Sequence, residues 1–149
     1  MNCYLMRHGD AVAATENPER PLSQRGRQRV EQTALRALAH GTQVARIFHS
    51  GILRAQETAT IMSEYLNPPA GVAILAGLAP EDDPMLATAE LEVAEEPILL
   101  VGHLPLLSRL AAGLVHGDAE RPAVEFLAAT LVCCRRTPAR WEIDWSIAL

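Results

Sequence analysis

Short apolar segments alternate with amphipathic segments of helical periodicity along most of the chain. The apolar segments predict β-strands at residues 3–6, 46–50, 73–75, 98–101, 130–135 and 141–147. Helical patterns separate the first four strands and follow the fourth, whereas the last two strands are close enough to pair as a hairpin. This order predicts a three-layer α/β/α fold, in which helices cover both faces of a mostly parallel sheet with an antiparallel edge strand.

Two local patterns support this architecture. The segment 98–101 is apolar without interruption and is bounded by Pro97 and Gly102, which is typical of a parallel strand buried on both faces. Ser23 precedes a helical pattern as its expected N-cap, and the apolar positions of that helix form one stripe. We expect the fourth helix to carry Pro105 in its first turn, where proline is tolerated.

Composition limits the classes of function. The 149 residues, 49% of them hydrophobic and 21% charged, predict a single domain over residues 1–149. The net charge of −5 and the scattered arginines argue against a nucleic-acid partner, and no apolar run approaches the about 20 residues of a membrane span. The chain contains no lysine, which excludes P-loop and Schiff-base chemistry.

The cysteines and histidines form no metal-binding pattern. Cys3, Cys133 and Cys134 are an odd set without C-x-x-C spacing, and the histidines show neither H-x-H nor H-x-x-x-H spacing. We therefore expect no metal and no cofactor. The cysteine usage and the absence of an apolar leader segment predict a cytoplasmic location.

Arginine and histidine residues come soon after three of the predicted strands. Arg7 and His8 follow the first strand, Arg54 lies just beyond the second, and His103 follows the fourth. Ligands of parallel α/β sheets bind beyond the carboxyl ends of the strands, so these side chains are expected to converge. Guanidinium groups match phosphoryl oxygens, and a neutral imidazole is a nucleophile toward phosphorus. The alternative is that both arginines form surface ion pairs with neighbouring carboxylates.

Four segments resemble the histidine phosphatase superfamily, also called the phosphoglycerate mutase-like family. Residues 7–9 (R-H-G) are similar to its signature after the first strand, and residues 21–26 (P-L-S-Q-R-G) to its P-L-[ST]-x-x-G motif. Residues 50–59 (SGILRAQETA) resemble its S-x-x-x-R-A-x-x-T-A segment, and residues 101–103 (V-G-H) its late histidine. These motifs occur in the family's order and cover nearly the whole chain.

Within this superfamily, R-H-G-D-A at residues 7–11 and G-H-L-P-L at residues 102–106 are most similar to the SixA-type phosphohistidine phosphatases, which act on phosphohistidine in proteins. The resemblance implies a phosphoglycerate mutase-like fold and a metal-independent phosphatase whose substrate is a phosphorylated protein, such as a phosphotransfer domain of a signalling relay. Two alternatives stay open. One is a small-molecule phosphomonoesterase of the same superfamily, and the other is a module that binds phosphorylated proteins without turnover.

The resemblance also implies a role for each residue of the site. His8 is the nucleophile that becomes phosphorylated, Arg7 and Arg54 bind the phosphoryl oxygens, and His103 completes the pocket. The two glycines of the motifs let the backbone approach the anion. The implied phosphate-binding set is Arg7, His8, Gly9, Arg54, Gly102 and His103.

The general acid is not determined by the sequence. Members that cleave phosphate esters usually carry a carboxylic acid after the third strand, where this chain has Glu81, Asp82 and Asp83. We take Asp83 and Glu81 as the candidate general acids. Because an imidazole leaving group is basic enough to be protonated before it departs, a poorly defined acid favours a phosphohistidine substrate over an ester.

Other residues near these motifs are expected to have supporting roles. Arg20 is either a substrate contact or a loop charge. Ser50 and Thr58 are expected to cap the second helix and to orient Arg54. Structural roles are expected for His40, His49 and His116.

Overall fold

The computed structural model describes residues 1–149 and contains the predicted elements in the predicted order. The strands are β1 (Asn2–Arg7), β2 (Arg46–His49), β3 (Val72–Ile74), β4 (Ile98–Gly102), β5 (Leu131–Arg136) and β6 (Trp141–Ile147). The helices are α1 (Gln24–Ala39), α2 (Leu53–Leu66), α3 (Pro84–Val93) and α4 (Leu106–His116). The sheet has the order β3-β2-β4-β1-β5-β6. Its first four strands are parallel, β5 runs antiparallel to β1, and β6 pairs antiparallel with β5 at the edge.

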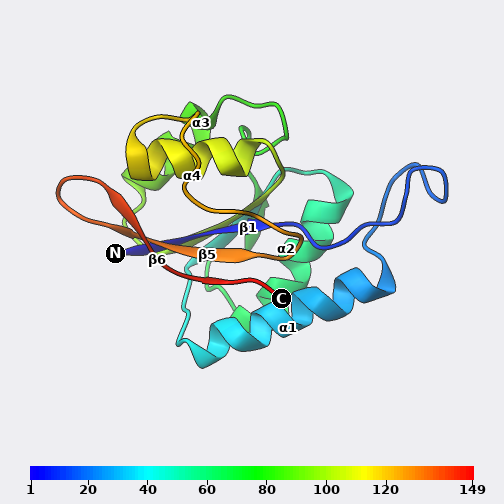
Figure 1. Cartoon of the computed structure of the whole chain (residues 1–149). Coiled ribbons are helices and arrows are strands. Elements are labelled where there is room, and N and C mark those ends of the chain that lie inside the picture. Colours follow the sequence, from blue (N-terminus) through cyan, green and yellow to red (C-terminus); the bar gives the residue numbers. More distant parts are fainter.

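The sheet is the middle layer of three. Helices α1 and α2 cover one face, and α3 and α4 cover the other (Figure 1). All five residues of β4 are buried. Leu99 and Val101 pack toward α1 and α2, whereas Ile98 and Leu100 pack toward α3 and α4. The predicted α/β/α architecture and the central strand buried on both faces are therefore confirmed.

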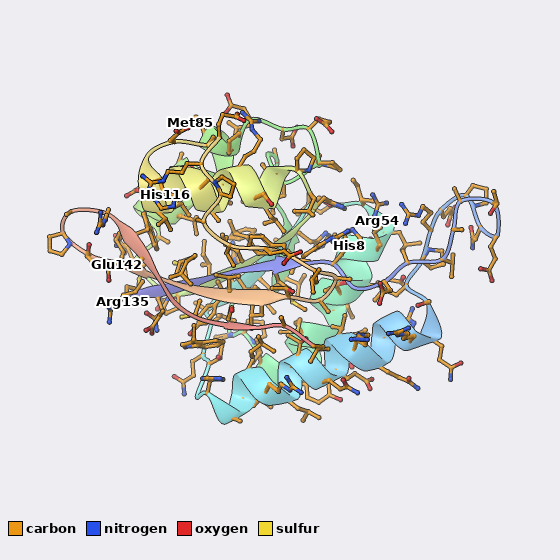
Figure 2. All side chains as sticks on the ribbon, in the orientation of Figure 1. His8, Arg54, Met85, His116, Arg135 and Glu142 are labelled. Carbon is orange, nitrogen blue, oxygen red and sulfur yellow. The ribbon has the colours of Figure 1, made fainter.

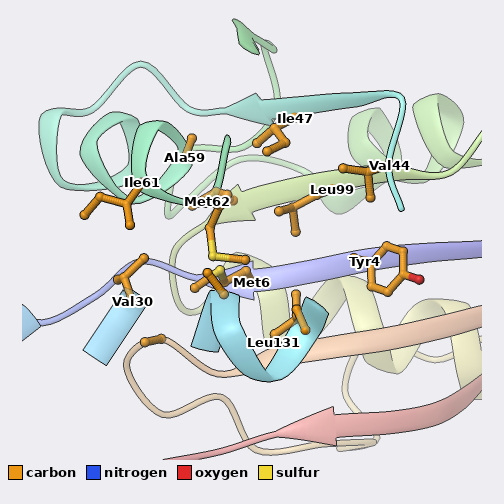
Figure 3. Close-up of a cluster of buried hydrophobic side chains, with 14 of the residues drawn as sticks. Tyr4, Met6, Val30, Val44, Ile47, Ala59, Ile61, Met62, Leu99 and Leu131 are labelled. Atoms are coloured by element: carbon orange, nitrogen blue, oxygen red, sulfur yellow. The ribbon is translucent and has the colours of Figure 1, made fainter. Parts of the chain in front are cut away.

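The larger hydrophobic core lies between the sheet and helices α1 and α2. Figure 3 shows Val30 of α1 and Met62 of α2 meeting Met6, Ile47 and Leu99 of the sheet. These five side chains come from segments far apart in the sequence, so the core joins β1, β2 and β4 to α1 and α2. None of the helices is long and apolar enough to cross a bilayer.

The two helix-start predictions differ in outcome. Ser23 is the N-cap of α1, and its hydroxyl accepts a hydrogen bond from the Gly26 N–H at 2.9 Å, as expected. Pro105 is the N-cap of α4 and does not lie in the first turn. Its carbonyl accepts the N–H of Arg109 at 3.2 Å, and proline takes the position just before the first residue of the helix.

The loop after β1 packs directly against the first turn of α1. A Cβ added to Gly26 would lie 2.0 Å from the Asp10 carbonyl oxygen, and one added to Gly9 would lie 2.7 Å from a methyl carbon of Val30. The Ser23 N–H also donates to the Asp10 carbonyl at 2.9 Å. The glycine of the second motif therefore allows the loop that follows His8 to lie against α1.

This contact can be tested by adding a methyl group. We expect Gly26→Ala to lower the free energy of unfolding by about 1–3 kcal/mol or more, because the clash is with backbone and cannot relax through a side chain. Gly113 lies in α4 with open space around its Cβ position. Gly113→Ala should therefore raise the free energy of unfolding by about 0.5–1 kcal/mol. Urea unfolding measures both variants, and wild-type stability of Gly26→Ala would contradict the packing argument.

Candidate active site

The carboxyl ends of three neighbouring strands meet at one edge of the sheet. Parallel pairing places Arg7 beside Gly102 and His49 beside Val101. The His8 N–H donates to the Gly102 carbonyl at 3.2 Å, which extends the pairing beyond β1. Residues that follow β1, β2 and β4 are therefore brought to the same place, as the sequence predicted.

The imidazole of His8 is held with Nε2 unprotonated. Its Nδ1 lies 2.8 Å from the Gly9 carbonyl oxygen, which can only accept, so we assign the ring hydrogen to Nδ1. Arg54 Nε donates to Nε2 at 3.3 Å. Figure 2 shows these two labelled side chains close together beyond β1. The unprotonated Nε2 of His8 thus accepts a hydrogen bond from a guanidinium group.

The surroundings of His8 oppose its protonation. Burial is the main cause that lowers its pKa from the ordinary 6.5 to about 4, and the charges of Arg54, Arg7 and Arg20 lower the pKa further. The hydrogen bond to the Gly9 carbonyl acts in the opposite direction. At neutral pH the His8 ring is therefore neutral and able to act as a nucleophile.

His103 lies next to His8. The two ring centroids are 4.9 Å apart, and the rings are inclined by 53°. His103 Nε2 is 2.7 Å from the Ser50 hydroxyl oxygen, and its Nδ1 is buried without a hydrogen-bond partner. Burial first, then His8, Arg54 and Arg7, lower the pKa of His103 to about 3. The pocket thus contains two neutral imidazoles in contact.

The guanidinium groups of the site have no carboxylate partner. Arg7 donates to the Phe126 carbonyl at 3.0 Å, and its Nε is buried without a partner. Arg20 donates through Nε to the Val12 carbonyl at 3.1 Å. The ion pairs of the protein are Arg27–Glu57, Arg109–Glu120 and Arg135–Glu142. The alternative in which Arg7 and Arg54 form surface ion pairs is therefore wrong.

The third arginine of the site is Arg20. Its backbone is left-handed, with a φ of 49°, and its charge lowers the pKa values of both His8 and Arg54. For Arg54, burial is the larger cause and Arg20 the second. Three positive charges therefore lie near two neutral imidazoles, and this arrangement favours the binding of an anion.

Hydrogen bonds from α2 connect the two main motifs. The Thr58 hydroxyl donates to the Arg54 carbonyl at 2.8 Å and accepts the Gly9 N–H at 3.0 Å. Thr58 thus supports the site, as predicted, but not as a helix cap. The N-cap of α2 is Ile52, which makes no side-chain cap bond, and Ser50 contacts His103 instead. The predicted capping role of Ser50 and Thr58 is therefore wrong.

The sequence did not identify one part of the site, the segment before β5. The Phe126 carbonyl binds Arg7, as described above. The Ala129 N–H lies 3.1 Å from the Arg7 carbonyl and 3.2 Å from the His8 carbonyl, in a left-handed conformation with φ of 62°. These are backbone contacts, which any side chain would allow, so no residue pattern marks them.

The acidic loop after β3 makes only local contacts. Asp83 is the N-cap of α3 and accepts the Met85 N–H at 2.9 Å, and Asp82 accepts the Ala79 N–H at 2.9 Å. Glu81 is exposed. None of these carboxylates is hydrogen-bonded to the histidines or arginines of the site, so the general acid stays a prediction.

The remaining histidines lie outside this cluster. His49 Nδ1 accepts the Gly51 N–H at 3.0 Å, and His40 stacks on Trp145 with ring centroids 4.0 Å apart. His116 is exposed at the end of α4. No group of three or more His, Cys, Asp or Glu side chains is placed to hold a metal ion.

The chain matches the family model of the histidine phosphatase superfamily (branch 1) over residues 3–79, a range that includes His8 and Arg54. The protein belongs to the histidine phosphatase superfamily. It is 31% identical over 123 residues to the phosphohistidine phosphatase SixA of Escherichia coli, covering 79% of this chain and 76% of that protein. These similarities and the architecture establish a phosphatase of this superfamily, a hydrolase that acts on a phosphorylated substrate.

Solved structures of other proteins match this chain over almost its full length. A structure of the protein histidine phosphatase SixA complexed with tungstate matches with a TM-score of 0.85 and 28% identity, covering 99% of this chain and 97% of that one. A mycobacterial glucosyl-3-phosphoglycerate phosphatase matches with a TM-score of 0.75 and 18% identity, covering 96% of each chain. The second likeness shows a common fold only. Phosphatases with this fold therefore need not share a substrate.

The pKa values of the two site histidines predict how stability depends on pH. The unfolded chain binds protons at both histidines near pH 6.5, whereas the folded protein binds them only near pH 4 and pH 3. The free energy of unfolding should therefore fall as the pH is lowered from 6.5 toward 4, and it should rise again when the pH is brought back to 6.5. Urea unfolding across this range measures the slope, and ¹⁵N NMR of the rings should find both neutral at pH 5.5. Protonation of either ring near pH 6.5 would contradict this interpretation.

Proposed function

We propose that this phosphatase hydrolyses phosphohistidine in a protein through a phosphohistidine intermediate on His8. The observation that carries the proposal is the state of the His8 ring, which is neutral and has its unprotonated Nε2 beside Arg54. A nucleophile toward phosphorus needs such a lone pair, and a phosphoryl group needs uncompensated positive charge around it. Arg7, Arg20 and Arg54 supply that charge.

The first chemical step transfers the phosphoryl group to the enzyme. His8 Nε2 attacks phosphorus, and the P–N bond of the substrate breaks as the leaving imidazole keeps the electron pair and takes a proton. The guanidinium groups of Arg7 and Arg54 bind the equatorial oxygens and stabilise the charge that develops on them. His103 completes the pocket beside the His8 ring.

The second step regenerates the enzyme. A water molecule attacks the phosphorus of phosphorylated His8, the P–Nε2 bond breaks, and inorganic phosphate leaves. The Gly9 carbonyl holds Nδ1–H throughout, so Nε2 is again the unprotonated nitrogen when the phosphoryl group departs. No redox change or further reactant is involved.

Three observations support the proposed substrate. The protein is similar to a phosphatase named for phosphohistidine, and a SixA structure binds tungstate, a tetrahedral oxyanion like phosphate. In addition, Asp82 and Asp83 accept local backbone hydrogen bonds and Glu81 is exposed, so no carboxyl group is held at the histidines. An imidazole leaving group tolerates a loosely placed acid better than an alkoxide does.

The intermediate can be trapped directly. Incubation with ³²P-labelled phosphoramidate should give a phosphoenzyme that is labile in acid and stable in base, because His8 Nε2 forms a P–N bond. His8→Ala should form none, while His116→Ala, altered at an exposed helix end, should be labelled like the wild type. Quenched-flow labelling followed by gel electrophoresis makes the measurement. Full labelling and turnover of His8→Ala would refute the assignment of the nucleophile.

A comparison of substrates tests the leaving-group argument. We expect kcat/KM to be higher for a phosphohistidine-bearing phosphotransfer protein than for phosphate monoesters of small molecules. Glu81→Gln and Asp83→Asn should lower ester hydrolysis by a larger factor than phosphohistidine hydrolysis, because an alkoxide leaving group depends on a positioned acid more strongly than imidazole does. Faster ester hydrolysis would favour the small-molecule phosphomonoesterase. Tight binding of the phosphoprotein without phosphate release would favour the binding module.

A further inference from the structure

Glu57 of α2 binds the segment that connects β1 to α1. Its Oε1 accepts the Leu22 N–H at 2.8 Å, and its Oε2 pairs with Arg27 of α1. The side chain of Glu57 is 19% exposed. The next residue of α2, Thr58, accepts the Gly9 N–H at 3.0 Å. Two consecutive residues of α2 therefore each hold one backbone N–H of the connecting segment.

The two ends of this segment meet at Leu22. An antiparallel bridge joins Leu22 to Ala11, and next to it the Val12 N–H donates to the Pro21 carbonyl at 2.9 Å. The Leu22 side chain is buried and packs on Gly9, where an added Cβ would lie 3.3 Å from its Cδ2. A displacement of Leu22 would therefore move both ends of the segment.

Two groups of the site are attached to these ends. The Gly9 carbonyl oxygen lies 2.8 Å from Nδ1 of His8. Arg20 lies just before the bridge, and its Nε donates to the Val12 carbonyl at 3.1 Å. After burial, Arg20 is one of the three arginines whose charges lower the pKa of His8. The proposed nucleophile and one positive charge of the pocket are therefore carried by the segment that Glu57 holds.

We propose that Glu57 is a positioning residue for the phosphoryl site. Its Oε1 fixes Leu22, and the bridge then sets the places of His8 and Arg20. The inference rests on the proposed function, because it takes the pocket to be the phosphoryl site. The hydrogen bond is the part that acts, since a buried backbone N–H needs an acceptor. The ion pair with the half-exposed Arg27 contributes little, as is usual for such pairs.

Two substitutions separate the hydrogen bond from the charge. Glu57→Gln keeps the side-chain length and an oxygen acceptor but loses the charge, whereas Glu57→Asp keeps the charge and is too short to reach Leu22. Glu57→Asp and Glu57→Ala should weaken the binding of tungstate and of inorganic phosphate by about tenfold, because a 1 Å misplacement of site groups can cost on the order of 100-fold. Glu57→Gln should stay within about threefold of the wild type. Calorimetry at fixed ionic strength measures the dissociation constants.

The matched control is Arg27→Ala, which removes the same ion pair and leaves the bond from Leu22 in place. Its tungstate affinity should stay within about twofold of the wild type. Amide hydrogen exchange at Leu22 should be faster in Glu57→Asp than in the wild type, and unchanged in Glu57→Gln and Arg27→Ala. Urea unfolding of the same variants measures stability separately, so a loss of affinity is not mistaken for a loss of folded protein.

The order of the variants decides the outcome. Wild-type tungstate affinity in Glu57→Asp would overturn the inference, and so would equal losses in Glu57→Ala and Arg27→Ala, because the ion pair would then be the cause. If Glu57→Ala does not fold, the comparison of Glu57→Gln with Glu57→Asp decides. If the expected order is found but the wild type does not hydrolyse phosphohistidine, the proposed function fails and the positioning role stands.

Discussion

The carbonyl oxygen of Gly9 controls the chemistry of the pocket because it determines which nitrogen of His8 carries the hydrogen. That oxygen holds Nδ1–H, and Nε2 is left facing Arg54. The position of Gly9 depends in turn on its N–H bond to Thr58 and on the close packing of this loop against Gly26. One backbone acceptor therefore links the packing of α1 and α2 to the protonation state of the proposed nucleophile.

The sequence predicted the fold and the four central side chains because both depend on patterns that residues display directly. Strand and helix periodicity determined the layers, and the rule for strand ends brought Arg7, His8, Arg54 and His103 together. The contacts of Phe126 and Ala129 were not predictable, since they involve only backbone atoms. The partners of hydroxyl groups were also missed, because a serine near a helix start has the same local pattern whether it caps the helix or binds a distant imidazole.

The shared fold explains why family membership does not determine the substrate. The sheet positions the residues of the proposed phosphoryl pocket at the carboxyl ends of its strands. The loop between β1 and α1 extends away from the sheet (Figure 1), and its residues 13–19 are all exposed. A mycobacterial glucosyl-3-phosphoglycerate phosphatase has the same architecture at 18% identity. Under the proposed function, the loops would select the leaving group, while the residues at the strand ends would carry out the phosphoryl transfer.

The uncompensated arginines also affect the conformational equilibrium of the whole chain. After burial, Arg20 is the second cause that lowers the pKa of Arg54, which means that the two like charges repel each other. Under the proposed function, a tetrahedral anion bound between these arginines offsets this repulsion, and it binds the folded chain but not the unfolded one. On that basis, an oxyanion in solution should raise the free energy of unfolding, and this stabilisation should increase with the concentration of the anion.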